Sequence, residues 1–196
     1  MGEVFIGLVH YPVLNKRGDI VATSVTNLDI HDIARLAVTY GVSKCFFINP
    51  MASQKRLVER IVEHWTTGFG MSYNPIRGEA LKGIVVVESF EVAQKEVMSI
   101  TGQIPGVVGT WAGHEGGYLS YHEMREKIKV GTTPYMILFG TGWGMPDEIK
   151  SMCTHILEPI RGIGDYNHLS VRTAAAIVLD RLRGRIETRG VTDEQN

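Results

Sequence analysis

Short apolar runs alternate along the chain with segments whose apolar residues recur every three or four positions. A short run bounded by glycine, proline or polar residues is typical of a buried strand, and the spaced pattern is typical of a helix packed on one face. The apolar runs occupy residues 4–10, 44–50, 83–88, 106–111, 136–139 and 155–157. This alternation predicts an α/β fold with a mostly parallel six-stranded sheet flanked by helices.

The segments between these runs predict helices. Expected helices cover residues 29–40, 54–64, 90–100 and 121–129, with a short one inside 145–152. A last helix is expected from its apolar stripe of Val171, Ala174, Ala175, Val178 and Leu182, with Asp165 or Asn167 as its N-cap. Residues 67–78 contain glycine, aromatic and proline residues without a period, so we expect a surface loop there.

Two predicted strands end in glycine-rich segments. Residues 136–139 run into Gly140-Thr141-Gly142-Trp143-Gly144, and residues 155–157 run into 158–164 (EPIRGIG). Glycines allow a sharp turn and leave backbone amides exposed to a ligand. Because open α/β sheets bind ligands beyond the carboxyl ends of their strands, these loops and the strand end at Thr110-Trp111 are the expected pocket.

The first glycine loop differs from two known nucleotide-binding motifs. The chain has no Gly-Lys-Ser/Thr sequence, which excludes a Walker loop. The spacing of Gly140, Gly142 and Gly144 imitates part of a dinucleotide fingerprint, with Asp165 where a ribose-binding acid could lie. The third glycine comes one residue early, and residues 145–152 are short for a crossover helix. A dinucleotide-dependent oxidoreductase therefore remains only as a third alternative.

The order of these features resembles the SPOUT class of methyltransferases. Residues 138–146 (LFGTGWGMP) are similar to the second motif of that class, with Thr141 in place of the usual Asn or a similar residue. Residues 158–162 followed by 167–176 are similar to the third motif, although 166–168 (YNH) replaces the usual Ser-Leu-Asn. Within the class, residues 165–176 look most like bacterial proteins described as RNA methyltransferase-like.

A weaker similarity covers residues 27–41. Arg35 lies six residues before Gly41, as the arginine of the first motif does, whereas Asn27 is two residues early. The resemblance implies that Arg35 is catalytic, by guiding a phosphate or helping to deprotonate a ribose hydroxyl. The alternative is a solvated ion pair between Arg35 and Asp32.

The resemblance implies a C-terminal trefoil knot, S-adenosylmethionine (SAM) as cofactor, and RNA, tRNA or rRNA, as substrate. It also implies a homodimer formed through the knot. The cofactor-binding residues that it implies are Thr110, Trp111, Leu138, Phe139, Gly140, Thr141, Gly142, Gly144, Ile160, Gly162, Ile163, Asn167, Leu169 and Ser170. The other alternative is a non-catalytic module that uses the same pocket to sense SAM or bind RNA.

Length and composition fit one domain. The chain has 196 residues, 44% of them hydrophobic, enough for a full core, and we expect a single domain over 1–190 followed by a polar tail over 191–196. Lysine and arginine number 20 against 21 acidic residues. The net charge of −1 shows no overall positive field, which argues mildly against RNA but leaves room for a local basic patch.

Targeting and metal signals are missing from the sequence. It has no signal-peptide pattern and no apolar run long enough for a membrane span, so a cytoplasmic protein is expected. Cys45 and Cys153 fall in apolar runs and are interpreted as small buried hydrophobes, and no histidine or cysteine spacing indicates a metal.

Several residues near the predicted pocket have chemistry of their own. His114-Glu115 and His168 are candidates for acid or base, with surface positions as the simpler reading. Trp111 and Trp143 either stack on a base or pack over the strand ends.

Overall fold

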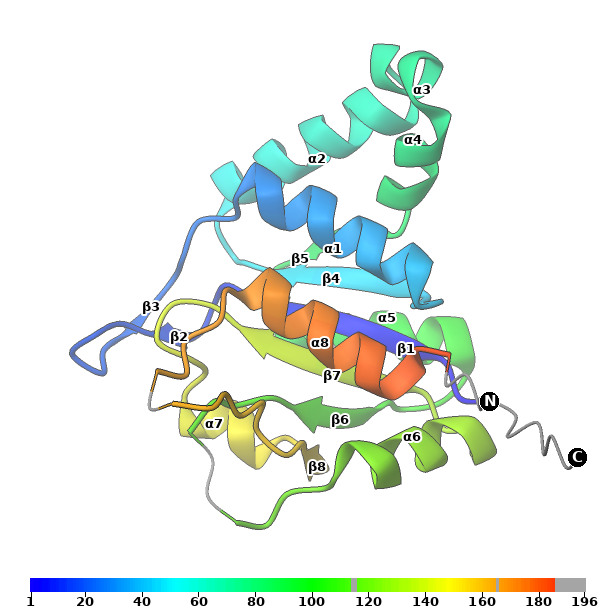
Figure 1. The fold of residues 1–196 in the computed structure, drawn as a ribbon. Helices are drawn as coiled ribbons and strands as arrows, with labels where there is room; N and C mark the ends of the chain where they lie inside the picture. The colour runs from blue at the N-terminus through cyan, green and yellow to red at the C-terminus, as the bar shows by residue number, and fades with distance from the viewer. Residues whose placement is uncertain (114–115, 165, 186–196) are drawn as a thin grey trace, which may run out of the picture.

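The molecule is built on one parallel sheet (Figure 1). The structure, a computed structural model, describes residues 1–113, 116–164 and 166–185. The strand order is β5-β4-β1-β7-β6-β8, and every pairing is parallel. The strands are β1 (Val4–Val9), β4 (Lys44–Ile48), β5 (Ile84–Val87), β6 (Gly106–Gly109), β7 (Tyr135–Gly140) and β8 (His155–Ile156). The predicted six-stranded sheet is confirmed. A hairpin of β2 (Val13–Leu14) and β3 (Ile20–Val21) lies apart from it.

The central strand β1 explains why the apolar runs are continuous. All six of its residues are buried, because helices cover both faces of the sheet. Val4, Ile6 and Leu8 pack into one core cluster, and Phe5 and Val9 pack into the other.

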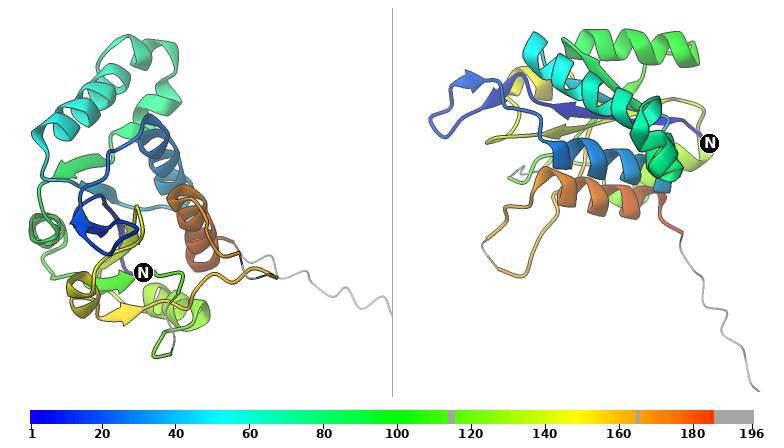
Figure 2. Two further views of the ribbon diagram at one scale, coloured as in Figure 1. Left: turned by 90° about the vertical axis from the view of Figure 1, so that its left-hand side faces the viewer. Right: turned by 90° about the horizontal axis from the view of Figure 1, so that it is seen from above.

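Helices form a layer on each face of the sheet (Figure 2). The larger core cluster joins the sheet to α1 (Asn27–Thr39), α2 (Ala52–Thr66), α6 (Tyr121–Val130) and α8 (Val171–Arg183). The smaller cluster joins the opposite face to α5 (Phe90–Thr101) and α7 (Asp147–Ser151). Figure 2 shows α1 and α8 side by side on one face and α5 on the other.

The prediction of a surface loop at 67–78 is wrong. The segment forms α3 (Phe69–Tyr73) and the start of α4 (Pro75–Leu81). Asn74 caps α4, since its side chain accepts a hydrogen bond from the amide of Arg77 at 3.1 Å. Gly70 lets α3 approach α2: a Cβ there would lie 2.7 Å from the Trp65 ring. The glycines therefore serve helix packing here.

The start of the last helix also differs from the prediction. Ser170 is the N-cap of α8, and its hydroxyl accepts from the amide of Thr173 at 3.3 Å. Asn167 lies four residues before Val171, the first residue of α8, and Asp165 lies outside the described residues. Ser170 is the N-cap, and not Asn167, because its short hydroxyl lies directly before the apolar stripe.

The C-terminal part of the chain returns across the sheet. β8 pairs with β6, and the chain then comes back so that α8 contacts α1, α6 and β7. A trefoil knot in this region stays a prediction, as do the domain bounds 1–190, whose end falls with the tail 191–196 outside the described residues.

Candidate functional site at the carboxyl ends of the strands

A cavity of about 880 Å³ opens at the carboxyl ends of β1, β6 and β7. The loops after β6 and β7, residues 158–160, and the segment leading into α8 form one side of it. The end of β1 and the segment leading into α1 form the other. Its lining residues are His10, Thr23, Ser24, Thr26, Asp29, Thr110, Trp111, Ala112, Gly113, Tyr121, Phe139, Gly140, Thr141, Gly142, Trp143, Gly144, Met145, Glu158, Pro159, Ile160, Asn167, His168, Leu169, Ser170, Val171, Ala174 and Val178.

The predicted cofactor-binding residues meet in this cavity, with three exceptions. Leu138 is fully buried, and its side chain packs in the core on the side of α5 and α7. Gly162 and Ile163 lie on the surface of the loop before α8, outside the lining. The remaining predicted residues come from three separate parts of the chain, after β6, at the end of β7 and before α8, and they line one cavity.

Backbone hydrogen bonds join the glycine loop after β7 to β2. The amide of Trp143 donates to the Leu14 carbonyl at 3.0 Å, and the amide of Leu14 donates to the Gly144 carbonyl at 2.8 Å. Gly142 has φ +59°, and a Cβ there would lie 2.9 Å from the Leu14 oxygen. Glycine is therefore required for the turn and for the close approach of β2.

The expectation that the glycine amides of this loop are exposed to a ligand is wrong for Gly144. Its amide donates to the Thr141 carbonyl at 3.1 Å, and the Thr141 amide donates to the Val9 carbonyl at 3.2 Å. The loop is therefore held largely by its own backbone and by β1, which fixes its shape before any ligand binds.

Two side-chain hydrogen bonds hold the third-motif region to its neighbours. The Asn167 side-chain amide donates to the Ala112 carbonyl at 3.3 Å, joining the segment before α8 to the loop after β6. The Glu158 carboxylate accepts from the Tyr121 amide at 2.8 Å, at the start of α6. The loops around the cavity are thus tied to one another.

The two tryptophans differ. Trp111 donates from Nε1 to the Met145 carbonyl at 3.3 Å, and its ring covers Gly109 so closely that no Cβ would fit there. Trp111 therefore packs over the end of β6. Trp143 is 61% exposed, so part of its ring is free to meet a ligand.

Polar side chains that the sequence pattern does not predict line the β1 side of the cavity and form a polar wall there. His10 directly follows β1 and is 1% exposed. Its Nδ1 lies 3.0 Å from the Thr23 hydroxyl, and that hydroxyl lies 2.5 Å from the hydroxyl of Thr141. Asp29 completes a capping box with Thr26 at the start of α1. The only signal in the sequence was a histidine immediately after an apolar strand.

Burial sets the protonation of this wall. Desolvation lowers the pKa of His10 from 6.5 to about 4, and the opposing pull of the Asp29 charge is smaller. The imidazole is therefore neutral at pH 7. Tyr121, also in the lining, has its pKa raised by burial and keeps its phenol proton.

The arginine beside the cavity is Arg172, at the start of α8. Its Nε lies 3.6 Å from Asp29, and its Nη1 lies 3.5 Å from Asp32. Arg35 is exposed on α1 and does not line the cavity of its own chain. Asp32 thus pairs with Arg172, and no Arg35–Asp32 ion pair is found among the described residues.

Of the other residues predicted as candidates for acid or base, only His168 can be placed in the structure. His168 lines the cavity and is exposed, whereas His114 and Glu115 lie outside the described residues. Within the described part of the chain, no three His, Cys, Asp or Glu side chains gather as metal ligands would.

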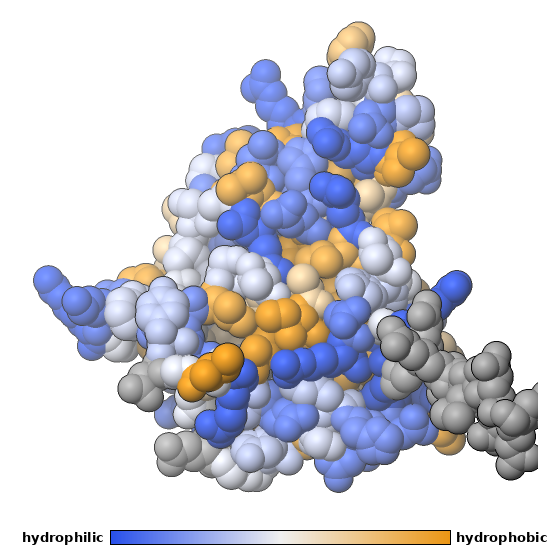
Figure 3. All heavy atoms as spheres, viewed as in Figure 1, coloured by the Kyte–Doolittle hydropathy of each residue, from blue (hydrophilic) through white to orange (hydrophobic). Residues whose placement is uncertain are grey.

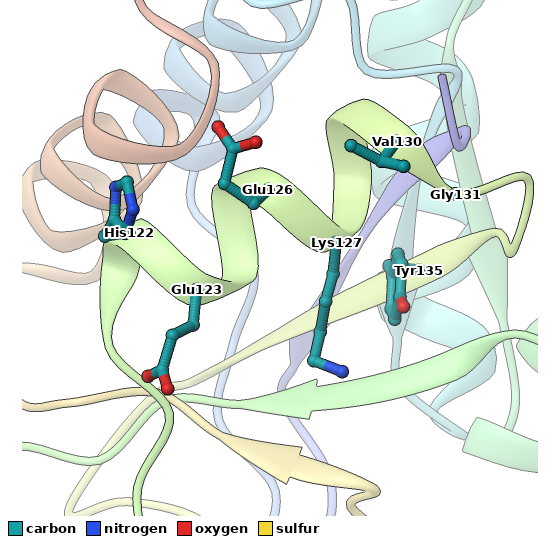
Figure 4. A pocket seen from close by; sticks show the side chains of 7 residues that line it. All are labelled: His122, Glu123, Glu126, Lys127, Val130, Gly131 and Tyr135. Carbon is teal, nitrogen blue, oxygen red and sulfur yellow. The ribbon is translucent and has the colours of Figure 1, made fainter.

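A second hollow of about 570 Å³ lies at the opposite end of the sheet, between α6 and the start of β7 (Figure 4). Its lining includes Glu123, Glu126 and Lys127. Glu126 lies 3.7 Å from Lys129 and Glu123 caps α6, so these groups already serve the helix. The glycine loops are not near this hollow, and the larger cavity is the candidate site.

Comparison with known proteins agrees with this geometry. A family described as SAM-dependent RNA methyltransferase matches residues 3–184. The chain belongs to this family. It is 45% identical over 185 residues to a tRNA (guanine-N(1)-)-methyltransferase of Oleidesulfovibrio alaskensis, covering 93% of this chain and 42% of that protein. It is also 38% identical over 183 residues to an uncharacterized protein of Aquifex aeolicus, covering 93% of this chain and 89% of that protein.

Solved structures of other proteins share this fold. The SpoU methyltransferase AviRb from Streptomyces viridochromogenes superposes with a TM-score of 0.58 at 17% identity, covering 92% of this chain and 58% of that one. Such a likeness shows the fold alone, and it supports the SPOUT resemblance. The cofactor of the family is SAM, as expected.

Membership in the methyltransferase family removes the oxidoreductase alternative. The topology agrees: the segment after the glycine loop of β7 contains only the short α7, and β8 then pairs with β6. A dinucleotide-binding unit needs a full crossover helix between neighbouring strands. The chain spans less than half of the O. alaskensis protein, so the activity in that protein's name is not thereby assigned to this segment.

Proposed function

We propose that this chain transfers a methyl group from SAM to RNA, with the cofactor in the cavity at the ends of β1, β6 and β7. The observation that carries the proposal is the meeting of the second-motif loop and the third-motif segment in one cavity. In the proposal, the cofactor lies against Gly140–Gly144 and against residues 167–170. A cavity of this size falls within the range of small-molecule sites.

Methyl transfer from SAM requires mainly that the protein position the reacting groups. SAM supplies an electrophilic methyl group on a sulfonium, and the protein has to place a nucleophile in line with it and accept the proton that is released. The tied loops provide rigid positioning, because Asn167 and Glu158 hold them to neighbouring elements.

The substrate is proposed as RNA, tRNA or rRNA, because the family description names RNA and one relative is named a tRNA methyltransferase. The guanine-N1 activity in that name belongs to a protein more than twice as long as the matched segment. The nucleotide and the methylated atom are therefore left to experiment. A cytoplasmic location follows from RNA as substrate. Across the described residues, none of the helices is both long and apolar enough to cross a membrane.

The protein is proposed to act as a homodimer through α8 and the segment before it. Apolar side chains gather over α8 and the segment leading into it on the face shown in Figure 3. Ile163 and Tyr166 are fully or mostly exposed there, and Leu169 is 45% exposed. Such a patch is typical of an interaction site.

The test is methyl transfer from labelled SAM to total RNA from a strain that lacks this protein. Labelled RNA and one modified nucleoside identified by mass spectrometry are expected. RNA from the parent strain is the control, because its sites are already methylated. Tight S-adenosylhomocysteine (SAH) binding with no transfer to any RNA would favour the non-catalytic module instead.

A further inference from the structure

His10 carries an unused hydrogen-bonding atom in the wall of the cavity. The side chain is 1% exposed and its ring stacks on Phe47, with the centroids 6.2 Å apart. Nδ1 contacts Thr23, but Nε2 has no hydrogen-bond partner among the described residues. Buried polar atoms are rarely left unpaired, and His10 lines the cavity, so a group bound there is a candidate partner for Nε2.

The hydrogen bonds around Thr23 favour one tautomer of His10. The Thr23 hydroxyl has one proton and lies 2.5 Å from the Thr141 hydroxyl, 3.0 Å from His10 Nδ1 and 3.5 Å from the His10 carbonyl. The Thr141 hydroxyl lies 3.0 Å from the Val9 carbonyl, to which it can donate. The tautomer with the proton on Nδ1 satisfies most of these contacts, because Thr23 then accepts from Nδ1–H and donates to Thr141, and it leaves Nε2 as an acceptor.

His10 lies where the predicted cofactor loop after β7 meets the segment before α1. β1 is the neighbour of β7 in the sheet, and the Thr23 hydroxyl lies 3.0 Å from His10 Nδ1 and 2.5 Å from the hydroxyl of Thr141, a predicted cofactor-binding residue. The other neighbours in the lining, Ser24 and Thr26, come from the segment before α1, where no predicted cofactor-binding residue lies. In the proposal, the group that receives the methyl enters beside this segment.

We propose that His10 is a specificity-determining residue for the target nucleotide: Nε2 accepts a hydrogen bond from an N–H or O–H group of the nucleotide that enters the β1 side of the cavity. The proposal rests on the proposed function. A bare acceptor repels a phosphate oxygen or a base carbonyl and selects a nucleotide that presents a donor at that point.

In the proposal, His10 selects and positions the target nucleotide, and it does not accept the proton released during methyl transfer. Because burial lowers its pKa to about 4, it is a poor acceptor of a full proton near neutral pH. Asp29, the charged group that most affects it, raises that pKa only in part. The dependence of kcat/KM on pH should therefore show no ionisation assignable to His10 between about pH 5 and pH 9.

The first experiment reads the imidazole directly. Nitrogen NMR of the ligand-free protein at pH 7 should show His10 protonated at Nδ1 and not at Nε2, and the opposite tautomer would overturn the proposal. SAH should then leave the Nε2 signal nearly in place, and hypomethylated RNA added next should shift it. A large shift with SAH alone would assign His10 to the cofactor.

The second experiment uses paired variants. His10→Asn keeps an amide near Nδ1 for Thr23 but removes the acceptor, whereas His10→Gln places an amide oxygen near Nε2. We expect His10→Asn to raise KM for RNA at least about tenfold with SAH affinity unchanged, and His10→Gln to recover part of that loss. The control is His122→Asn, an exposed histidine on α6, which should match the wild type.

The outcomes separate this proposal from the proposed function. Equal KM values in all three variants, with folded protein, refute the role of His10 while leaving methyl transfer intact. Wild-type protein that methylates no RNA refutes the proposed function, and the NMR shift with RNA still decides whether His10 contacts a nucleotide. If His10→Asn does not fold, Thr23→Val is the substitute variant. It keeps the imidazole but removes the hydroxyl that favours the proton on Nδ1, and an unchanged KM for RNA in that variant overturns the proposal.

Discussion

The hydroxyl oxygens of Thr23 and Thr141 lie 2.5 Å apart, although 118 positions separate the two residues in the chain. This contact joins the segment before α1 to the glycine loop after β7, and so joins the two sides of the cavity. Thr141 occupies the position where the SPOUT motif usually has Asn. Here its hydroxyl holds the loop to β1, through the Val9 carbonyl at 3.0 Å.

The first prediction concerns this link. Thr23→Val and Thr141→Val should each lower the free energy of unfolding by about 1 kcal/mol, the usual net value of a hydrogen bond. The double variant should lose less than the sum, because one shared bond is removed twice. Urea unfolding of the four proteins measures the coupling. Strict additivity would show that the short contact contributes nothing. Thr66→Val, whose hydroxyl bonds only within α2, is the control.

The second prediction is a pH dependence of stability due to His10. Its folded pKa is about 4 and its unfolded value is 6.5, so between these values the unfolded state binds the proton and the folded state does not. Stability should therefore fall as pH drops from 6.5 towards 4, by up to about 3 kcal/mol from this group.

The measurement for this prediction is urea unfolding at pH 7 and pH 4.5 for wild type and His10→Asn. The variant should lose clearly less stability over that interval. His31 and His155, whose pKa values are also lowered by burial, contribute in the same direction in both proteins, so the comparison isolates His10. Identical pH slopes would mean that His10 titrates normally.

Much of the fold was predictable because it depends on local pattern. The six strands and most helices follow from apolar runs and helical spacing, which the two-sided burial of β1 and the single apolar face of α8 preserve in the sequence. Residues 67–78 were misread because Gly70 and Gly78 serve close packing against α2, which no local signal reveals. Helix α4 was marked by Asn74-Pro75, a recognisable start.

Half of the cavity could be predicted, and the reason is topological. The glycine loops follow apolar strands, so their role as strand ends is visible in the sequence. The contribution of His10 and Thr23 depends on β1 lying beside β7, a pairing between residues more than a hundred positions apart. The motif resemblance predicts the glycine loops, whereas the contribution of His10 and Thr23 follows only from the strand order.

The third prediction concerns the cofactor side. Asn167→Ala removes the hydrogen bond from the third-motif segment to the Ala112 carbonyl, so the two loops lose a tie. Calorimetry should show SAH binding weakened about tenfold, equivalent to about 1.4 kcal/mol. Asn15→Ala, in the exposed turn between β2 and β3, should bind normally. Wild-type affinity in Asn167→Ala would remove Asn167 from the cofactor site. Addition of a chelator should change neither protein.

The fourth prediction concerns the homodimer. Ile163 is fully exposed in the segment before α8 and does not line the cavity, so its exposure is not explained by the site. Ile163→Asp should convert a dimer into a species near 21.7 kDa by light scattering, because a buried charge in an apolar contact is costly. Ile104→Asp, exposed just before β6, is the matched control and should remain dimeric. A monomeric wild type at micromolar concentration would contradict the prediction.

The last prediction tests Arg35, which the first-motif resemblance makes catalytic although it lies outside the cavity of its own chain. Arg35 is six residues beyond Asp29, about 9 Å along α1, and in this prediction it meets a part of the RNA that extends past the cavity. If it grips a phosphate there, Arg35→Ala and Arg35→Lys should both lower kcat/KM for RNA at least about tenfold, since lysine lacks the planar fork.

SAH affinity should be unchanged in both Arg35 variants, because the predicted cofactor loops lie at the ends of other elements. Arg172→Ala provides the contrast, since Arg172 pairs with Asp29 and Asp32 and bridges α1 to α8. That variant should lose about 1 kcal/mol of stability, whereas Arg35→Ala should lose almost none, because Arg35 is exposed. Full activity in Arg35→Ala would return Arg35 to a solvated position on α1 and leave substrate recognition to the cavity wall around His10.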